Sequence, residues 1–82
     1  MYSTYILFSN SLRKYYTGHT IDLIRRLEEH NRGKTAFMAK GMPWVLMFKK
    51  EFHTRAEAVE LERYIKKRGA FRYLSDNGVK RG

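Results

Sequence analysis

The chain has 82 residues, a formal net charge of +9 and no cysteine. This length allows one domain with a small core, and the lack of cysteine excludes disulfide frameworks, thiolate metal sites and cysteine nucleophiles. Aromatic residues make up 15% of the chain and partly compensate for its size, because each buries a large apolar area.

The strong excess of basic residues indicates a polyanionic partner. Seventeen Lys and Arg residues stand against eight Asp and Glu residues, which favours binding whose affinity falls as salt rises. Nucleic acid is the first candidate, an anionic membrane surface the second, and charge that serves only solubility the alternative. No apolar run reaches the roughly 18 residues of a membrane helix, and no signal-peptide pattern begins the chain. We therefore expect a cytoplasmic protein without a membrane span.

Residue type and periodicity predict the order strand, strand, helix, strand, helix, which is an α+β fold within the broad α/β class. Its three strands would form a small, mainly antiparallel sheet flanked by helices, with one sheet face left partly open for a ligand. In chain order we predict a strand over 2–8, a strand from 14 to 18, a helix over 22–31, a helical turn over 35–41, a strand over 44–52, a helix over 54–68 and a further turn over 71–74.

Local signals support these elements. Thr20 or Asp22 can cap the first helix, and Thr54 followed by Glu57 forms a capping box for the second. The alternation of the third strand places Trp44, Leu46 and Phe48 on one face.

The helical phase of the first helix places two basic side chains beside its apolar stripe. Arg26 and His30 lie at the edge of this stripe, whereas Arg25 and Glu29 are predicted to face outwards. An arginine in this position needs a partner or an anion-binding cleft. For His30 alone, a helix C-cap or a surface position is the alternative interpretation.

The second long helix carries one carboxylate on its core side. Glu62 falls within the apolar sector, whereas Glu57 and Glu60 point away. A half-buried carboxylate usually has a cation partner, either a basic side chain or a metal. A structural ion pair between Glu62 and Arg26 is therefore the alternative to a metal site.

Five short motifs follow one another along the chain: Ser3-Thr4-Tyr5, Tyr16-Thr17-Gly18, the segment 22–31, Pro43-Trp44, and Thr54-Arg55-Ala56-Glu57-Ala58 leading to Glu62. In this order they resemble the GIY-YIG nuclease superfamily, and specifically its small stand-alone branch of UvrC-like and homing-endonuclease-like proteins. The resemblance covers residues 2–68 and depends on the order and spacing of the motifs, since two tyrosines eleven residues apart are ordinary by themselves.

The resemblance implies a set of catalytic residues. Glu62 matches the single metal-binding carboxylate and would hold one Mg²⁺ or Mn²⁺ ion. Arg26 would neutralise charge on the scissile phosphate. Either Tyr16 or His30 would activate the attacking water, and Tyr5 would bind a phosphate oxygen or that water.

The resemblance also implies contacts to the substrate. Gly18 matches the motif glycine, and His19 stands where UvrC-type proteins have a lysine. The family's late active-site asparagine falls near Leu74, and Asn77 is the nearest candidate for it. A basic run would grip backbone phosphates, or would complement the dipole at the end of its helix. The run consists of Arg63, Lys66, Lys67, Arg68 and Arg72.

The sequence therefore predicts a metal-dependent DNA endonuclease of the GIY-YIG type, with residues 1–75 as the nuclease domain and 76–82 as a basic mobile tail. Branched or single-stranded DNA is a candidate substrate, RNA an alternative, and a partner protein a candidate source of specificity. Repair, mobile-element and defence roles all fit. A nucleic-acid-binding module that cleaves poorly is the second hypothesis, and a structural or protein-interaction role is the third.

Overall fold

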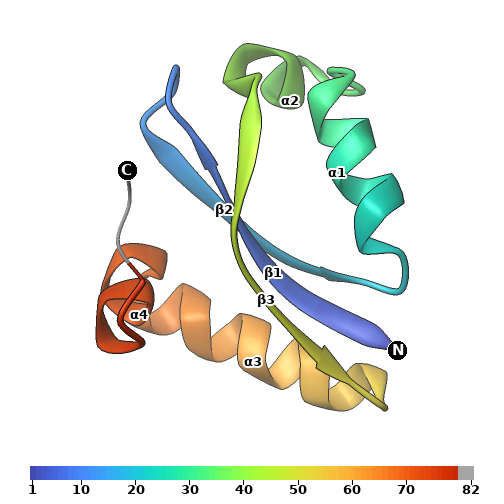
Figure 1. Cartoon of the computed structure of the whole chain (residues 1–82), viewed down its shortest axis with the longest axis vertical. Helices are drawn as coiled ribbons and strands as arrows, with labels where there is room; N and C mark the ends of the chain where they lie inside the picture. The colour runs from blue at the N-terminus through green and yellow to red at the C-terminus, as the bar shows by residue number, and fades with distance from the viewer. Residues whose placement is uncertain (80–82) are drawn as a thin grey trace.

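The computed structural model describes residues 1–79. A three-stranded antiparallel sheet with the strand order β2-β1-β3 separates two pairs of helices (Figure 1). The α+β class and the predicted order are confirmed. The elements are β1 (Tyr2–Ser9), β2 (Lys14–Thr20), α1 (Leu23–Asn31), α2 (Ala36–Gly41), β3 (Trp44–Phe52), α3 (Arg55–Arg68) and α4 (Ala70–Asp76).

Both faces of the sheet are covered, which corrects the prediction of a partly open face. β1 is the central strand, and its successive side chains point to opposite faces. Tyr5 packs with Trp44 in the cluster that includes side chains of α1. Ile6 packs with Ile65 and Leu74 in the cluster formed with α3 and α4. The open region of the molecule is therefore an edge of the sheet rather than a face.

A β-bulge corrects the predicted face of the third strand. Consecutive residues of β1 pair with Leu46 and with Phe48, so Met47 is an extra residue in β3. Trp44 and Leu46 consequently belong to the core beside α1, whereas Phe48 packs on the opposite side with α3 and α4.

Side-chain caps fix the starts of the two longer helices at the predicted places. The side chain of Asp22 accepts a hydrogen bond from the backbone N–H of Arg25 at 3.1 Å. Thr54 Oγ1 accepts one from the backbone N–H of Glu57 at 3.3 Å. Each cap satisfies an N–H group that the first turn of a helix would otherwise leave without a partner.

The C-terminal helix is longer than the predicted turn over 71–74. α3 ends at Arg68 and is capped by Gly69, whose φ of +94° suits glycine, and α4 then runs from Ala70 to Asp76. Val79 packs against the core cluster on this side of the sheet. Residues 80–82, the end of the predicted tail, lie outside the described residues. Within residues 1–79, no helix is long and apolar enough to cross a membrane.

Candidate active site

A pocket of about 860 Å³ opens along the edge strand β2 and is bordered by α1 and α3. Four of the five predicted catalytic residues line it, and they come from four different elements. The pocket also contains Gly18, His19 and Lys66 from the predicted substrate-binding set. The predicted residues in its wall are Tyr5, Tyr16, Gly18, His19, Arg26, Glu62 and Lys66.

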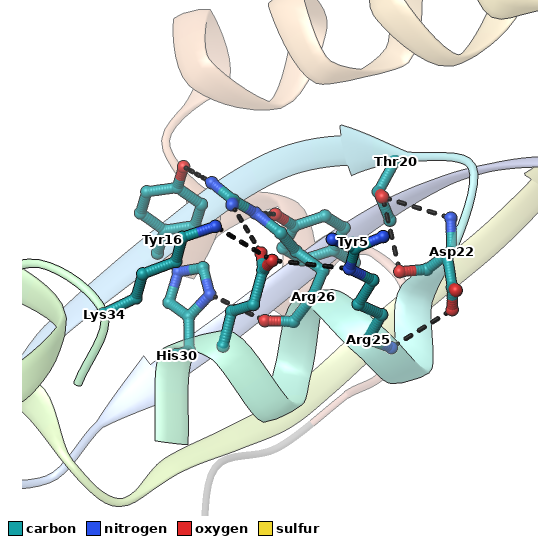
Figure 2. Close-up of polar contacts among 9 residues, drawn as sticks. Tyr5, Tyr16, Thr20, Asp22, Arg25, Arg26, His30 and Lys34 are labelled. Atoms are coloured by element: carbon teal, nitrogen blue, oxygen red, sulfur yellow. Dashed lines mark hydrogen bonds and ion pairs between the residues drawn. The ribbon is translucent and has the colours of Figure 1, made fainter. Parts of the chain in front are cut away.

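Arg26 joins the two motif tyrosines. Its Nε donates to Tyr5 Oη at 3.3 Å and its Nη2 to Tyr16 Oη at 3.4 Å. Figure 2 shows the guanidinium of Arg26 between the two phenols. Arg26 Nη1 donates to Glu29 Oε1 at 3.0 Å. These contacts hold a planar cation over the two hydroxyl groups, and they raise the pKa of Arg26 further above its ordinary value.

Glu29 does not face outwards as predicted. Its carboxylate is half-buried and also accepts a hydrogen bond from Lys34 Nζ at 3.1 Å. The hydrogen bonds from Lys34 and Arg26 hold the pKa of Glu29 below its ordinary value. Glu29 therefore acts as a positioning residue for the guanidinium, a role that the sequence did not reveal.

Tyr5 is held as a neutral phenol. The residue is only 1% exposed, and burial raises the pKa of its hydroxyl to about 12, although the hydrogen bond from Arg26 opposes this shift. Gly18 provides the space for this phenol, because a Cβ at position 18 would lie 2.8 Å from Tyr5 Oη and 3.2 Å from the Tyr16 ring.

Glu62 reaches the pocket from the opposite side of the sheet. Gly18 pairs with Tyr5 and His19 with Thr4, so the side chain of His19 points toward α3. His19 Nδ1 lies 2.5 Å from Glu62 Oε1, and Lys66 Nζ lies 2.6 Å from Glu62 Oε2. The predicted alternative pairing of Glu62 with Arg26 is therefore not found. Burial opposes ionisation of Glu62, but the hydrogen bonds from Lys66 and His19 outweigh it and lower its pKa.

Thr4 fixes α3 against the sheet. Its buried hydroxyl donates to the carbonyl oxygen of Ala58 at 2.7 Å. Because Thr4 and Tyr5 are neighbours in β1, one side chain binds α3 and the next faces Arg26 on α1. The first motif thus places both halves of the pocket relative to one strand.

Glu62 offers one carboxylate to a divalent ion, and His19 and Lys66 contact its two oxygens. Within residues 1–79, no group of three or more His, Asp and Glu side chains could hold a metal. A single carboxylate is still compatible with Mg²⁺, which binds oxygen ligands and keeps several waters. The side chain of Lys66 is 58% exposed, and exposed ion pairs are weak, so Lys66 can release Glu62 to a metal.

His30 lies outside the pocket. It is fully buried, and its Nδ1 lies 3.1 Å from the carbonyl oxygen of Arg26, to which it donates if protonated at that nitrogen. The His30 ring centroid is 4.7 Å from that of Tyr16 and 5.4 Å from that of Trp44, and burial lowers the pKa of His30. This position supports the ring of Tyr16 from the core side.

Asn77 also lies outside the pocket, at the end of α4. Its Nδ2 donates to the carbonyl oxygen of Tyr73 at 2.8 Å.

The predicted basic run is divided between two pockets. Lys66 lines the pocket that contains Glu62, whereas Lys67, Arg68 and Arg72 line a different one.

Two arginines in the pocket wall were not among the predicted site residues. Arg25 is exposed at the rim, and Arg55 lies over the ring of Tyr2 at 5.2 Å. Arg55 precedes Glu62 by seven residues, about two helical turns, and this spacing is the sequence signal that could have identified it.

Comparison with known proteins places the chain in a family. The model of the GIY-YIG catalytic domain matches residues 1–73. UPF0213 protein YazA of Bacillus subtilis (strain 168) is 43% identical over 54 residues, which cover 65% of this chain and 54% of that protein. The UPF0213 protein in the ldhD 5′ region of Pediococcus acidilactici is 33% identical over 70 residues, which cover 78% of this chain and 71% of that protein. UPF0213 protein VNG_2274C of Halobacterium salinarum is 42% identical over 53 residues, which cover 63% of this chain and 69% of that protein.

The chain thus spans about half the length of the Bacillus subtilis relative. No solved structure matches it significantly. The catalytic-domain match suggests nuclease activity, and nucleases of this kind typically use a divalent metal. The names of the relatives give no activity. The match over residues 1–73 shows that this chain belongs to the GIY-YIG catalytic domain family.

Proposed function

We propose that the protein is a metal-dependent endonuclease that hydrolyses DNA phosphodiester bonds. One observation carries this proposal: two phenols, a guanidinium and a carboxylate from four separate elements line one pocket at the edge of the sheet. Hydrolysis of a phosphodiester needs an oriented water, neutralisation of charge on the phosphate and help for the leaving oxygen. The pocket residues match these three needs.

Arg26 is the group that would meet the phosphate. Its guanidinium is fixed by Glu29 on one side and by the two phenols on the other. A planar cation held in this way can donate to two phosphate oxygens and stabilise the charge that grows on them in the transition state.

Tyr16 is favoured over His30 for orienting the attacking water. Tyr16 lines the pocket, whereas His30 is fully buried behind it. Tyr5 would act as a hydrogen-bond donor to the phosphate or the water, because its raised pKa keeps the proton on its oxygen at neutral pH.

Glu62 would hold the divalent ion, with Lys66 turning from the carboxylate toward the nucleic acid. When bound, Mg²⁺ or Mn²⁺ supplies positive charge at the phosphate and lowers the pKa of a coordinated water.

The decisive test compares Glu62→Gln with Glu60→Gln. Both variants remove one negative charge from α3, but Glu60 is exposed and lies outside the pocket. With Mg²⁺ or Mn²⁺ and supercoiled, branched and single-stranded DNA, Glu62→Gln should lose at least about a hundredfold in rate. Its DNA affinity should be retained, and Glu60→Gln should cleave like the wild type. Equal rates for the two variants would contradict the proposal.

A nucleic-acid-binding module is the second candidate function. It is favoured by the side chains of His19 and Lys66, which occupy both oxygens of Glu62. If the wild type binds DNA but cleaves none of these DNA substrates, nor RNA, with either metal, the module is the correct function, and a partner protein would then supply the chemistry.

A further inference from the structure

A second pocket lies on the far side of α3 from Glu62. It has a volume of about 360 Å³ and is lined by Tyr64, Lys67, Arg68 and Arg72. Tyr64 follows Glu62 by two residues, which is a rotation of roughly 200° around the helix. The two pockets are therefore separated by the body of α3, and we call the second one the Tyr64 pocket.

The ring of Tyr64 is exposed but held in place. It is 55% exposed, and it stands edge-on to Tyr73 with centroids 6.0 Å apart and an interplanar angle of 77°. Tyr73 in turn stands edge-on to Phe48 of β3, at 5.2 Å and 84°. This row of three rings connects the sheet to the surface. An exposed ring with a fixed orientation loses little side-chain entropy when a flat group stacks on it.

The cations of the Tyr64 pocket have different tasks. Arg68 forms a two-point ion pair with Asp76, with Nε–Oδ2 and Nη2–Oδ1 distances of 2.8 and 3.1 Å, and so ties α3 to α4. Among residues 1–79, neither Lys67 nor Arg72 makes a side-chain hydrogen bond or ion pair, although the charge of Arg72 acts on the carboxylate of Asp76 from beyond contact distance. These two cations are available to an anionic ligand beside the ring.

We propose that the Tyr64 pocket binds an unpaired segment of a nucleic-acid strand, with a base stacked on Tyr64 and phosphates at Lys67 and Arg72. Stacking on an aromatic side chain requires an unpaired base, since a duplex covers the faces of its bases. An acidic peptide would satisfy the two cations but would have no flat group for the ring. The inference rests on the proposed function in taking nucleic acid as the ligand. It adds that the substrate carries a single strand that leaves the duplex.

The test measures binding in EDTA, where no metal-dependent cleavage occurs. The probes are a fluorescein-labelled oligothymidylate and a labelled duplex of equal length, followed by fluorescence anisotropy. Tyr64→Ala should weaken binding of the single strand by roughly 5- to 100-fold and leave binding of the duplex unchanged. Tyr64→Phe, which keeps the ring, should retain the affinity. Lys67→Ala should also weaken binding of the single strand.

Phe71 provides a matched control. It is 62% exposed and lies outside the Tyr64 pocket, so Phe71→Ala should bind both probes like the wild type. The inference is overturned if Tyr64→Ala and Phe71→Ala behave alike, if the duplex loses as much affinity as the single strand, or if polyglutamate binds the pocket as tightly as the oligothymidylate. Failure of the proposed nuclease function would show separately, as absence of cleavage when Mg²⁺ is added.

Discussion

Tyr5 combines near-complete burial with a hydroxyl that faces the pocket, and this combination limits its chemistry. A phenol whose pKa is about 12 is neutral at physiological pH. It can donate a hydrogen bond but cannot act there as a base. In our proposal Tyr5 therefore does not activate the water, and Tyr16 takes this role. Tyr16 accepts a hydrogen bond from the same guanidinium of Arg26 as Tyr5 does.

The same burial should make folding stability depend on alkaline pH through Tyr5. Its pKa rises from 10.0 to about 12 on folding, so folding favours the protonated form. This contribution is of order 2 to 3 kcal/mol; it is fully present below about pH 10 and is lost as the pH rises toward 12. Urea unfolding should show the wild type losing about 1 kcal/mol more than Tyr5→Phe between about pH 9 and 11. Equal losses in the two proteins would contradict this assignment.

Helical phase could predict which side chains face or border the core, but not which groups of other elements they meet. It placed Glu62 within the apolar sector of its helix and Arg26 at the edge of its apolar stripe, and both line the pocket. Glu29 was predicted to face outwards because a single helix does not show that Lys34, beyond the end of α1, folds back onto its carboxylate. His30 was placed on the correct side of α1, but the sequence could not show that Tyr16 and Trp44 enclose it.

At the scale of elements, β2 separates the two halves of the site, and Gly18 in β2 leaves the space that the phenol of Tyr5 occupies. In Gly18→Ala the new Cβ would lie 2.8 Å from Tyr5 Oη and would displace the phenol from Arg26. We expect an overpacking cost of about 1 to 3 kcal/mol and a loss of at least about tenfold in cleavage rate through misplacement. Urea unfolding and DNA nicking, both at a temperature where the variant is folded, measure the two effects.

Gly78→Ala is the control for this substitution. Gly78 has a φ of +73° and no atom within 4 Å of an added Cβ, so alanine there should cost about 1 to 2 kcal/mol through backbone strain alone. Its cleavage rate should equal that of the wild type. A wild-type rate for Gly18→Ala would show that the close approach of Tyr5 and β2 is not needed for cleavage.

Cap signals and periodicity predicted where the long elements begin, but not how the sheet is covered. Asp22 and Thr54 are local signals, since each caps the helix that directly follows it. The bulge at Met47 depends on pairing with β1, so alternation within the third strand could not reveal it. α4 is short, and a seven-residue helix gives a weak periodic signal. Its buried Leu74 helps to cover the sheet face against which α3 also packs.

At the scale of the whole molecule, the net charge of +9 favours association with a polyanion, and in our proposals the distribution of this charge decides which strand is bound where. Lys66 and Lys67 are neighbours in sequence and line different pockets on α3. In our proposals the first serves the strand at the active site and the second serves the unpaired strand. Because adjacent residues of a helix point in different directions, these two neighbouring lysines would bind two different strands.

The salt dependence of binding should separate these two lysines. Log K falls as log salt rises, and here the slope means the steepness of this fall. Each phosphate contact that is lost lowers the slope by about 0.9 for a duplex and about 0.7 for a single strand. We expect Lys66→Ala to lower the slope for the duplex, and Lys67→Ala to lower it for the oligothymidylate but not for the duplex. Anisotropy titrations over a range of salt concentrations measure both slopes. If both variants changed the duplex slope equally, the basic run would be one continuous surface; if neither changed any slope, these lysines would not contact phosphates. A separation of the two slopes would support the proposal that α3 presents its cations to two different strands.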